Sequence, residues 1–100
     1  YYNRGVSYEE LGQDRDAIND YTKAIQLDPD YAWPYLARGN SYNNLGQYQD
    51  ALQSFNEAIR LEPNGARYQW RGNTYQKLGQ YDLARPDWDR ACQLDREWCR

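Results

Sequence analysis

Residues 32–63 read AWPYLARGNSYNNLGQYQDALQSFNEAIRLEP, and this stretch decides the fold. Its first half spaces aromatic and small residues for one face of a helix with 3.6 residues per turn, and Leu45-Gly46 supplies the glycine that commonly ends a helix. Its second half continues with the same spacing, and Pro63 marks where the second helix must stop. The residues concerned are Tyr35, Gly39 and Tyr42 in the first half and Ala51, Leu52, Phe55, Ala58 and Ile59 in the second. The stretch therefore predicts two helices joined by a short turn.

The same pattern occurs three times in the 100 residues. Arg4-Gly5 recurs as Arg38-Gly39 and again as Arg71-Gly72, with the second interval shorter than the first by a single residue. The repeat signature consists of Gly5, Tyr8, Ala17, Gly39, Tyr42, Ala51, Phe55, Ala58, Pro63, Gly72, Tyr75, Ala84, Trp88 and Ala91. A fixed period of this length indicates stacked repeats. We expect one solenoid domain with units at 1–31, 32–64 and 65–98, the first of them shortened at its N-terminus.

Glycines inside the predicted helices indicate close helix packing. Gly costs up to about 1 kcal/mol relative to Ala in a helix interior, so an interaction must offset the cost of Gly39 and Gly72. We expect the paired helix to approach closely there through the small Ala51 and Ala84.

Other residues predict where helices begin and bend. Asp30 and Asn64 are expected to cap the helices that follow them. Pro86 lies about a turn into a helix that we expect to begin near Tyr81, where the missing backbone N–H predicts a slight bend.

The composition argues against catalysis, cofactor or metal binding, and nucleic-acid binding. The chain has no His, the side chain that most often serves as general base or metal ligand near neutral pH, and its net charge is −3 with no basic cluster. The acidic residues Glu9-Glu10, Asp14 and Asp16 lack the organised loop of a cation site and are interpreted as solvated charges. No stretch approaches the roughly 18 consecutive apolar residues of a membrane span. We expect a soluble chain, with the cytoplasm slightly favoured.

The two cysteines lie in the last ten residues. Cys92 and Cys99 are seven residues apart on what the pattern predicts to be one helix, which would place them too far apart for a disulfide. Cys92 occupies the repeat position of Ile25 and Ile59, so we expect a thiol packed in the core.

The recurring aromatic, glycine, tyrosine and alanine positions, with a proline closing the unit, resemble the tetratricopeptide repeat family. Nearly the whole chain shares the resemblance. The unit from Ala32 to Pro63 fits best, whereas the third unit has Arg96 where the family has proline. The resemblance implies an all-α fold, an α-α superhelix of six antiparallel helices. It also implies that the first helix of each unit lines a concave groove that binds a peptide or a partner protein, as in a scaffold or adaptor.

Helical geometry gives the candidate groove residues, on the side of each first helix opposite to its core face. They are Trp33, Leu36, Ala37, Asn40 and Asn44 in the second unit and Gln69, Trp70, Asn73 and Lys77 in the third. Asn40 and Asn73 occupy equivalent positions, and an amide that both donates and accepts can bond the main chain of an extended ligand. The alternative is that both asparagines are solvated and that Trp33 and Trp70 pack between neighbouring helices.

One known type of partner is not expected. Family members that grip the C-terminal carboxylate of heat-shock chaperones use Lys, Asn and Arg at five groove positions. The corresponding residues here are Tyr2, Val6, Ala37, Ala66 and Trp70. None of the five matches, so a chaperone tail is excluded from the expected partners.

Each unit has an arginine directly before its helix glycine and a polar residue at a constant spacing after it. The pairs are Arg4 and Asp20, Arg38 and Ser54, and Arg71 and Asp87. One interpretation is a basic ladder for an acidic ligand. The favoured one is that each arginine stem packs at the core edge while its head pairs with an Asp on a second helix.

Three functions follow from this sequence. The leading hypothesis is a binding module for a peptide or partner protein. A second is head-to-tail self-assembly, because residues 1–34 hold three basic and seven acidic side chains (net −4) whereas residues 67–100 hold seven and five (net +2). A third is a rigid spacer or regulatory arm. Because the last predicted helix would leave an apolar face uncovered, we expect further repeats or a capping helix in a longer parent protein.

Overall fold

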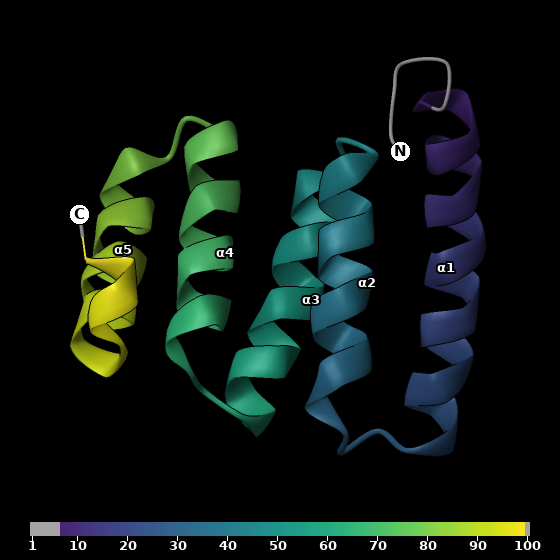
Figure 1. Ribbon diagram of the computed structural model, residues 1–100, viewed down its shortest axis with the longest axis horizontal. Coiled ribbons are helices and arrows are strands. Elements are labelled where there is room, and N and C mark those ends of the chain that lie inside the picture. Colours follow the sequence, from purple (N-terminus) through teal and green to yellow (C-terminus); the bar gives the residue numbers. More distant parts are fainter. Residues whose placement is uncertain (1–6, 100) are drawn as a thin grey trace.

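The structure is a computed structural model that describes the backbone of residues 7–99 and the side chains of residues 13–99. Within these residues five α-helices follow one another, and a short 3₁₀ helix comes after the last of them (Figure 1). They are α1 (Ser7–Leu27), α2 (Ala32–Asn44), α3 (Tyr48–Leu61), α4 (Gly65–Lys77), α5 (Tyr81–Leu94) and η2 (Arg96–Trp98). No helix among residues 7–99 is both long and apolar enough to span a bilayer.

The turns after α2 and α4 are formed at the Leu-Gly pairs, as the sequence predicts. Gly46 and Gly79 adopt φ values of 76° and 75°, in the left-handed region that glycine enters without steric cost. The Gly46 N–H donates to the carbonyl of Asn43 at 2.9 Å, and the Gly79 N–H donates to that of Gln76 at 2.9 Å. These turns fold α2 back on α3 and α4 back on α5 as antiparallel pairs.

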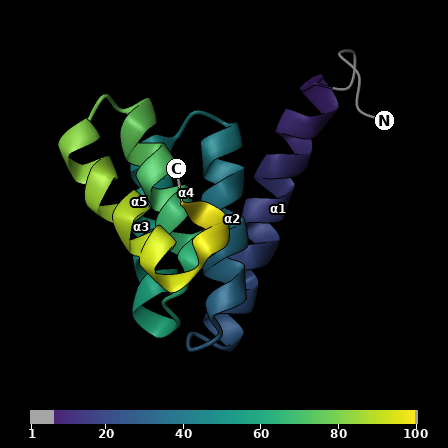
Figure 2. The same cartoon turned by 60° about the vertical axis from the view of Figure 1, so that its left-hand side comes forward.

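The first unit departs from this plan, and the prediction of six helices is wrong for the described residues. Gly12 lies inside α1, which runs through the expected turn as one helix of 21 residues. A continuous helix keeps its backbone hydrogen bonds through this position, and a glycine inside a helix is tolerated at a modest cost. Figure 2 shows the first turns of α1 diverging from α2.

One of the two predicted helix caps is confirmed. Asn64 precedes α4, and its side chain accepts a hydrogen bond from the Arg67 N–H at 3.0 Å. The prediction for Asp30 is wrong, because α2 begins at Ala32 and the residue in the cap position is Tyr31, which makes no side-chain cap. Asp30 lies one residue too early to reach the first free N–H groups of α2.

The core is thin and lies between the paired helices. Each helix packs on its neighbours in chain order, so α2 lies against α1 and α3, and α4 lies against α3 and α5. The buried apolar residues are Ala32, Tyr35, Ala51, Leu52, Phe55, Ala58, Ile59, Ala84 and Ala91. All but Ala32 belong either to the predicted inner faces of the second unit or to the repeat signature, so helical spacing and the repeat together predicted the core.

Close helix packing at the glycines is present, but the nearest neighbour is an aromatic ring. A Cβ added to Gly39 would lie 2.6 Å from the Phe55 ring, and one added to Gly72 would lie 2.8 Å from the Trp88 indole. The prediction that Ala51 and Ala84 make the close approach therefore named the wrong residues. The ring is larger than an alanine and extends across the gap to the glycine.

The expectation of two separate cysteines is also wrong. Cys92 and Cys99 form a disulfide, with their Cα atoms 4.4 Å apart. The expectation assumed one continuous helix, but α5 ends at Leu94 and the chain turns back through η2. Cys92 is therefore a bonded half-cystine rather than a core thiol. The turn also places Trp98 against Gly65, where an added Cβ would lie 2.8 Å from the indole.

Candidate interaction surface

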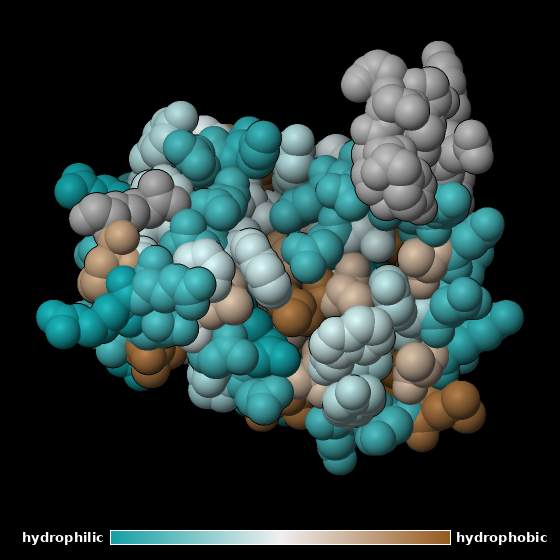
Figure 3. All heavy atoms as spheres, in the orientation of Figure 1, coloured by the Kyte–Doolittle hydropathy of each residue, from teal (hydrophilic) through white to brown (hydrophobic). Residues whose placement is uncertain are grey.

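The predicted groove residues lie on α2 and α4 with very different exposure. Trp33 is 49% exposed, and Asn44 and Lys77 are exposed. Gln69 is only 9% exposed. The half-buried members are Leu36, Ala37, Asn40, Trp70 and Asn73. On the face of Figure 3, apolar side chains gather in a depression near the middle, between the places of α4 and α2 in Figure 1.

A buried polar contact joins α2 to α4 directly. The Asn43 side-chain amide donates to the Thr74 hydroxyl at 2.9 Å, and Thr74 has no exposed surface. The Thr74 hydroxyl also lies 3.0 Å from the Trp70 carbonyl, to which it can donate. This contact fixes the register of the two helices that supply the candidate surface. Sequence reasoning missed both residues, although the hydroxyls of Ser7, Ser41 and Thr74 recur at one repeat position and offered a signal.

Asn40 and Asn73 occupy equivalent repeat positions but have different surroundings. The Asn73 side-chain oxygen accepts a hydrogen bond from the Trp88 indole N–H at 3.0 Å. The repeat position of Trp88 is held by Phe55 in the second unit, and a phenyl ring has no N–H to donate. Asn73 is therefore tied to α5, whereas Asn40 has a half-buried amide with no hydrogen bond to another described side chain.

Trp33 lies at the boundary between α2 and α1. Its ring meets that of Tyr21 edge to face, with 5.5 Å between the ring centroids. Edge-to-face pairs are a favourable arrangement of aromatic rings. Half of Trp33 remains exposed, so it contributes both to the α1–α2 contact and to the outer surface.

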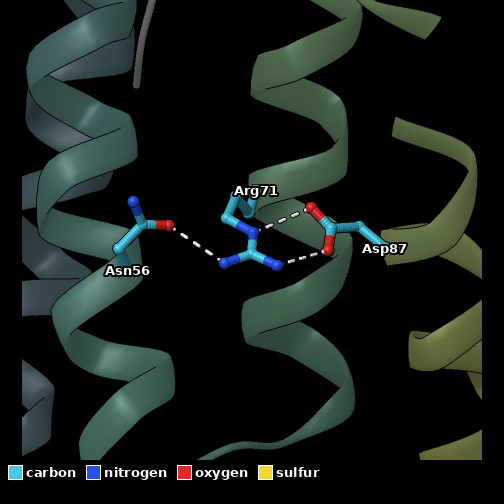
Figure 4. A network of polar contacts seen from close by, with 3 residues as sticks. All are labelled: Asn56, Arg71 and Asp87. Atoms are coloured by element: carbon cyan, nitrogen blue, oxygen red, sulfur yellow. Dashed lines mark hydrogen bonds and ion pairs between the residues drawn. The ribbon is translucent and has the colours of Figure 1, made fainter. Parts of the chain in front are cut away.

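Arg38 and Arg71 each bridge two second helices. The Arg71 Nε and Nη2 donate to the two Asp87 oxygens at 2.8 and 2.6 Å, and its Nη1 donates to the Asn56 oxygen at 2.9 Å (Figure 4). Asp87 belongs to α5 and Asn56 to α3, so one guanidinium ties α4 to the helices on both sides of it.

Arg38 repeats the bridge one unit earlier with neutral partners. Its Nε donates to the Ser54 hydroxyl of α3 at 3.0 Å, and its Nη1 donates to the Thr22 hydroxyl of α1 at 3.3 Å. The favoured interpretation of the arginines, that each head pairs with an Asp on a second helix, is confirmed for Arg71 and Asp87. Arg38 departs from it, because its partner on the second helix is the Ser54 hydroxyl. Arg4 lies outside the described residues. The basic-ladder interpretation is not favoured, because both guanidinium groups already have partners.

Tyrosine rings flank each bridging arginine. The guanidinium carbon of Arg38 lies 5.6 Å from the centroid of Tyr35 and 6.0 Å from that of Tyr42. Arg71 lies at the same two distances from Tyr68 and Tyr75. Cation–π attraction at this range adds to the hydrogen bonds.

The electrostatic surroundings stabilise the charged form of Arg71. The hydrogen bond with Asp87 raises the pKa of Arg71, while burial acts in the opposite direction. Asp87 is itself 4% exposed, so the pair is a largely desolvated, bidentate ion pair.

Comparisons with known proteins agree with this architecture. Three family descriptions match in tandem, "TPR repeat" over residues 8–46 and "Tetratricopeptide repeat" over residues 32–64 and 66–98. No curated protein matches the sequence with significance.

Solved structures of similar fold include MamA of AMB-1, with a TM-score of 0.80 and 23% identity over 90% of this chain. A thermophilic TPR protein of Thermus thermophilus has a TM-score of 0.80 and 26% identity over 86% of this chain. The chain covers 52% of the MamA structure and 44% of the Thermus structure.

A third structure is the first TPR domain of Spaghetti (RPAP3), solved with the HSP90 peptide SRMEEVD. It has a TM-score of 0.81 and 27% identity, and the match covers 91% of this chain and 73% of that domain. The repeat signature, the paired helices and the tandem matches lead to one conclusion: the chain belongs to the tetratricopeptide repeat family.

Proposed function

We propose that this chain is a protein-interaction module that binds an extended segment of a partner protein across α2 and α4. The observation that carries the proposal is Asn40. Its amide is half-buried on α2, has no described side-chain partner, and lies one turn from the half-buried Leu36 and Ala37. A main chain laid over this position would satisfy the amide, and the neighbouring side chains would contact its apolar residues.

The proposed binding surface consists of the candidate groove residues predicted from the sequence, and these residues have different roles. Trp33 supplies exposed aromatic area at one end and Lys77 an exposed charge at the other. Trp70 and Asn44 complete the rim, while Gln69 and Asn73 support it from beneath through their contact, 3.4 Å between side-chain nitrogen and oxygen. The units at 1–31, 32–64 and 65–98 are proposed to act together as one scaffold or adaptor segment, with no catalytic role assigned.

A chaperone tail is not the proposed partner. The Spaghetti domain was solved with an HSP90 peptide, but that describes the other protein. Here Ala37, Ala66 and Trp70 stand where clamp-type members place cationic and amide side chains, so a terminal carboxylate would lack its partners.

The proposal can be tested by selecting binders from a displayed library of random peptides. We expect Asn40→Ala to weaken binding of the selected peptides roughly tenfold at an unchanged melting temperature, because one main-chain hydrogen-bond pair and its desolvated site are lost. Gln53→Ala, on the exposed side of α3, serves as the control and should leave binding intact.

Asn73→Ala should instead lower the melting temperature as well, because it removes the bond to Trp88. The peptide SRMEEVD should not bind. Selected peptides that bind wild type and Asn40→Ala equally would refute the proposed surface.

A further inference from the structure

The helix α5 lies at the opposite end of the array from α1, and one of its sides is open (Figure 1). Among the described residues, α3 packs on both α2 and α4, whereas α5 packs on α4 and the short η2. On α3, Asn56 bonds Arg71 of α4, and Leu52, one turn before it, is only 7% exposed. The corresponding residues of α5 are Asp89 and Arg85, and both are exposed. The side of α5 that corresponds to the α4-facing side of α3 is therefore uncovered.

This side of α5 carries two opposite charges one helical turn apart. Neither Arg85 nor Asp89 makes a hydrogen bond or an ion pair with any described residue. They do not pair with each other, and a cation placed N-terminal to its anion is the less favourable order for pairing within one helix. Both charges are therefore available to a partner.

The two charges define what can cover this side of α5. An apolar helix laid over it would leave both charges buried and unpaired, at a high free-energy cost. A suitable partner must offer an acidic group to Arg85 and a cation to Asp89, one helical turn apart and in the reverse order. A second α5 helix, turned antiparallel to the first, meets this requirement with its own Asp89 and Arg85.

We propose that the α5 face, defined by Tyr81, Arg85, Trp88 and Asp89, binds the same face of a second copy of this chain about a twofold axis. The two α5 helices lie antiparallel, and the axis passes between Arg85 and Asp89. Arg85 of each copy then pairs with Asp89 of the other copy, so the same ion pair forms on both sides of the axis. The charges of the α5 face are complementary to themselves, which identifies a second copy as the occupant.

Two aromatic residues supply the rest of the contact. Together with Arg85 and Asp89, Tyr81 and Trp88 line a hollow on α5 that can receive side chains of the second copy. Tyr81 is 55% exposed, whereas Tyr48 at the same position of α3 is half-buried. The Trp88 indole is held by its hydrogen bond to Asn73, so its ring loses little freedom when the face is covered. Tryptophan, tyrosine and arginine are also the residues that most often dominate the energy of protein interfaces.

The symmetry of the contact determines the size of the assembly. A contact that joins the same surface of two copies is satisfied once the pair has formed, so the α5 face gives a closed dimer. A head-to-tail contact would instead join different surfaces and continue into rings or open chains. The mass of the associated species therefore distinguishes the two modes of self-association.

Light scattering of the 100-residue chain from micromolar to millimolar concentration provides the test. We expect wild type to approach the mass of a dimer and to dissociate as salt is raised, because salt screens the exposed ion pairs. Arg85→Asp and Asp89→Arg should each weaken association by roughly tenfold or more, since each places like charges together. A mixture of the two variants restores opposite charges on both sides of the axis and should dimerise. The double variant Arg85→Asp/Asp89→Arg should dimerise alone, a result expected only if two α5 faces meet.

Arg90→Asp serves as the control, because Arg90 is exposed on α5 but does not line the hollow. Circular dichroism of each variant separates lost association from lost folding. The proposal is overturned by a wild type that stays monomeric throughout, by species larger than a dimer, by an equal loss of association in Arg90→Asp, or by a double variant that stays monomeric. Peptide binding across α2 and α4 does not involve Arg85 or Asp89, so the Asn40 experiment succeeds or fails independently.

Discussion

At the scale of single residues, Gly39 shows how the absence of a side chain determines packing. The Phe55 ring occupies the space where a Cβ would lie, at 2.6 Å. We predict that Gly39→Ala lowers stability by about 1–3 kcal/mol through overpacking, despite the better helix propensity of alanine. Thermal unfolding measures the change. The double variant Gly39→Ala/Phe55→Leu should recover part of the loss, and additive effects would contradict the contact.

Asp87 is the residue whose removal should matter most among the arginine bridges. Asp87→Ala leaves the partly buried Arg71 guanidinium without its carboxylate, and we predict a loss of about 3 kcal/mol. Ser54→Ala, which removes the neutral partner of Arg38, should cost only about 1 kcal/mol. Denaturant unfolding compares the two, and equal losses would contradict the view that charge makes the difference.

The pH dependence of this bridge follows from the raised pKa of Arg71. A raised pKa in the folded state means that the cation contributes its full stability below the pKa of unfolded arginine. That contribution is lost only as pH rises through the folded pKa, far into the alkaline range. The part of the stability loss in Asp87→Ala that comes from Arg71 should therefore be the same at every pH near neutrality.

The contacts of single residues were predictable where the repeat spacing brings complementary side chains together. They were not predictable where two units differ only in one hydrogen-bond donor. Asn40 and Asn73 are indistinguishable in the repeat, yet the indole N–H of Trp88 engages Asn73 alone. Arg71 and Asp87 were paired correctly because their spacing recurs in every unit with complementary chemistry. The second partner, Asn56, lies in the preceding unit, and the spacing of residues within one unit does not predict contacts between units.

At the scale of elements, the same Leu-Gly-Gln motif gives a turn twice and a helix once. Gly46 adopts a φ of 76°, while Gly12 lies within α1. We predict that Gly12→Ala stabilises the chain by about 0.5–1 kcal/mol and that Gly46→Ala destabilises it by about 1 kcal/mol. The two variants control for each other in thermal unfolding. A loss of stability in Gly12→Ala would indicate a turn at that position.

The bounds of α2 to α5 were largely predictable, because glycine, proline and asparagine mark them locally. The uninterrupted α1 was not predictable from its motif. A Leu-Gly pair permits a helix to end but does not require it, because glycine is also tolerated inside a helix at a modest cost. The end of α5 was missed for a related reason, since the turn at Asp95 lacks the proline that closes the second unit.

At the scale of the whole molecule, the disulfide reinforces one end of the array. Cys92 and Cys99 close a small loop that places Trp98 on Gly65 of α4. We predict that reduction lowers the free energy of unfolding by about 2 kcal/mol and changes the fluorescence of Trp98. Thermal unfolding with and without a dithiol reductant measures this. The Cys92→Ser/Cys99→Ser variant should be insensitive to reductant, and an equal response from it would refute the assignment.

The disulfide also bears on the compartment. Reducing compartments keep most protein thiols free, whereas disulfides persist in oxidising ones. The sequence alone left the compartment open, with the cytoplasm slightly favoured. The Cys92–Cys99 bond persists where the surroundings do not reduce it.

The shared arginines have a consequence for how the array loses its structure. Arg71 bonds Asn56 in the preceding unit and Asp87 in its own. One side chain therefore couples the stability of the α4–α5 pair to the stability of the contact between α4 and α3. In a linear array, strong nearest-neighbour coupling makes a partly melted state rare, because a unit that opens withdraws hydrogen bonds from the unit beside it. The described units should therefore unfold in one cooperative step, and Asp87→Ala should divide that step into two.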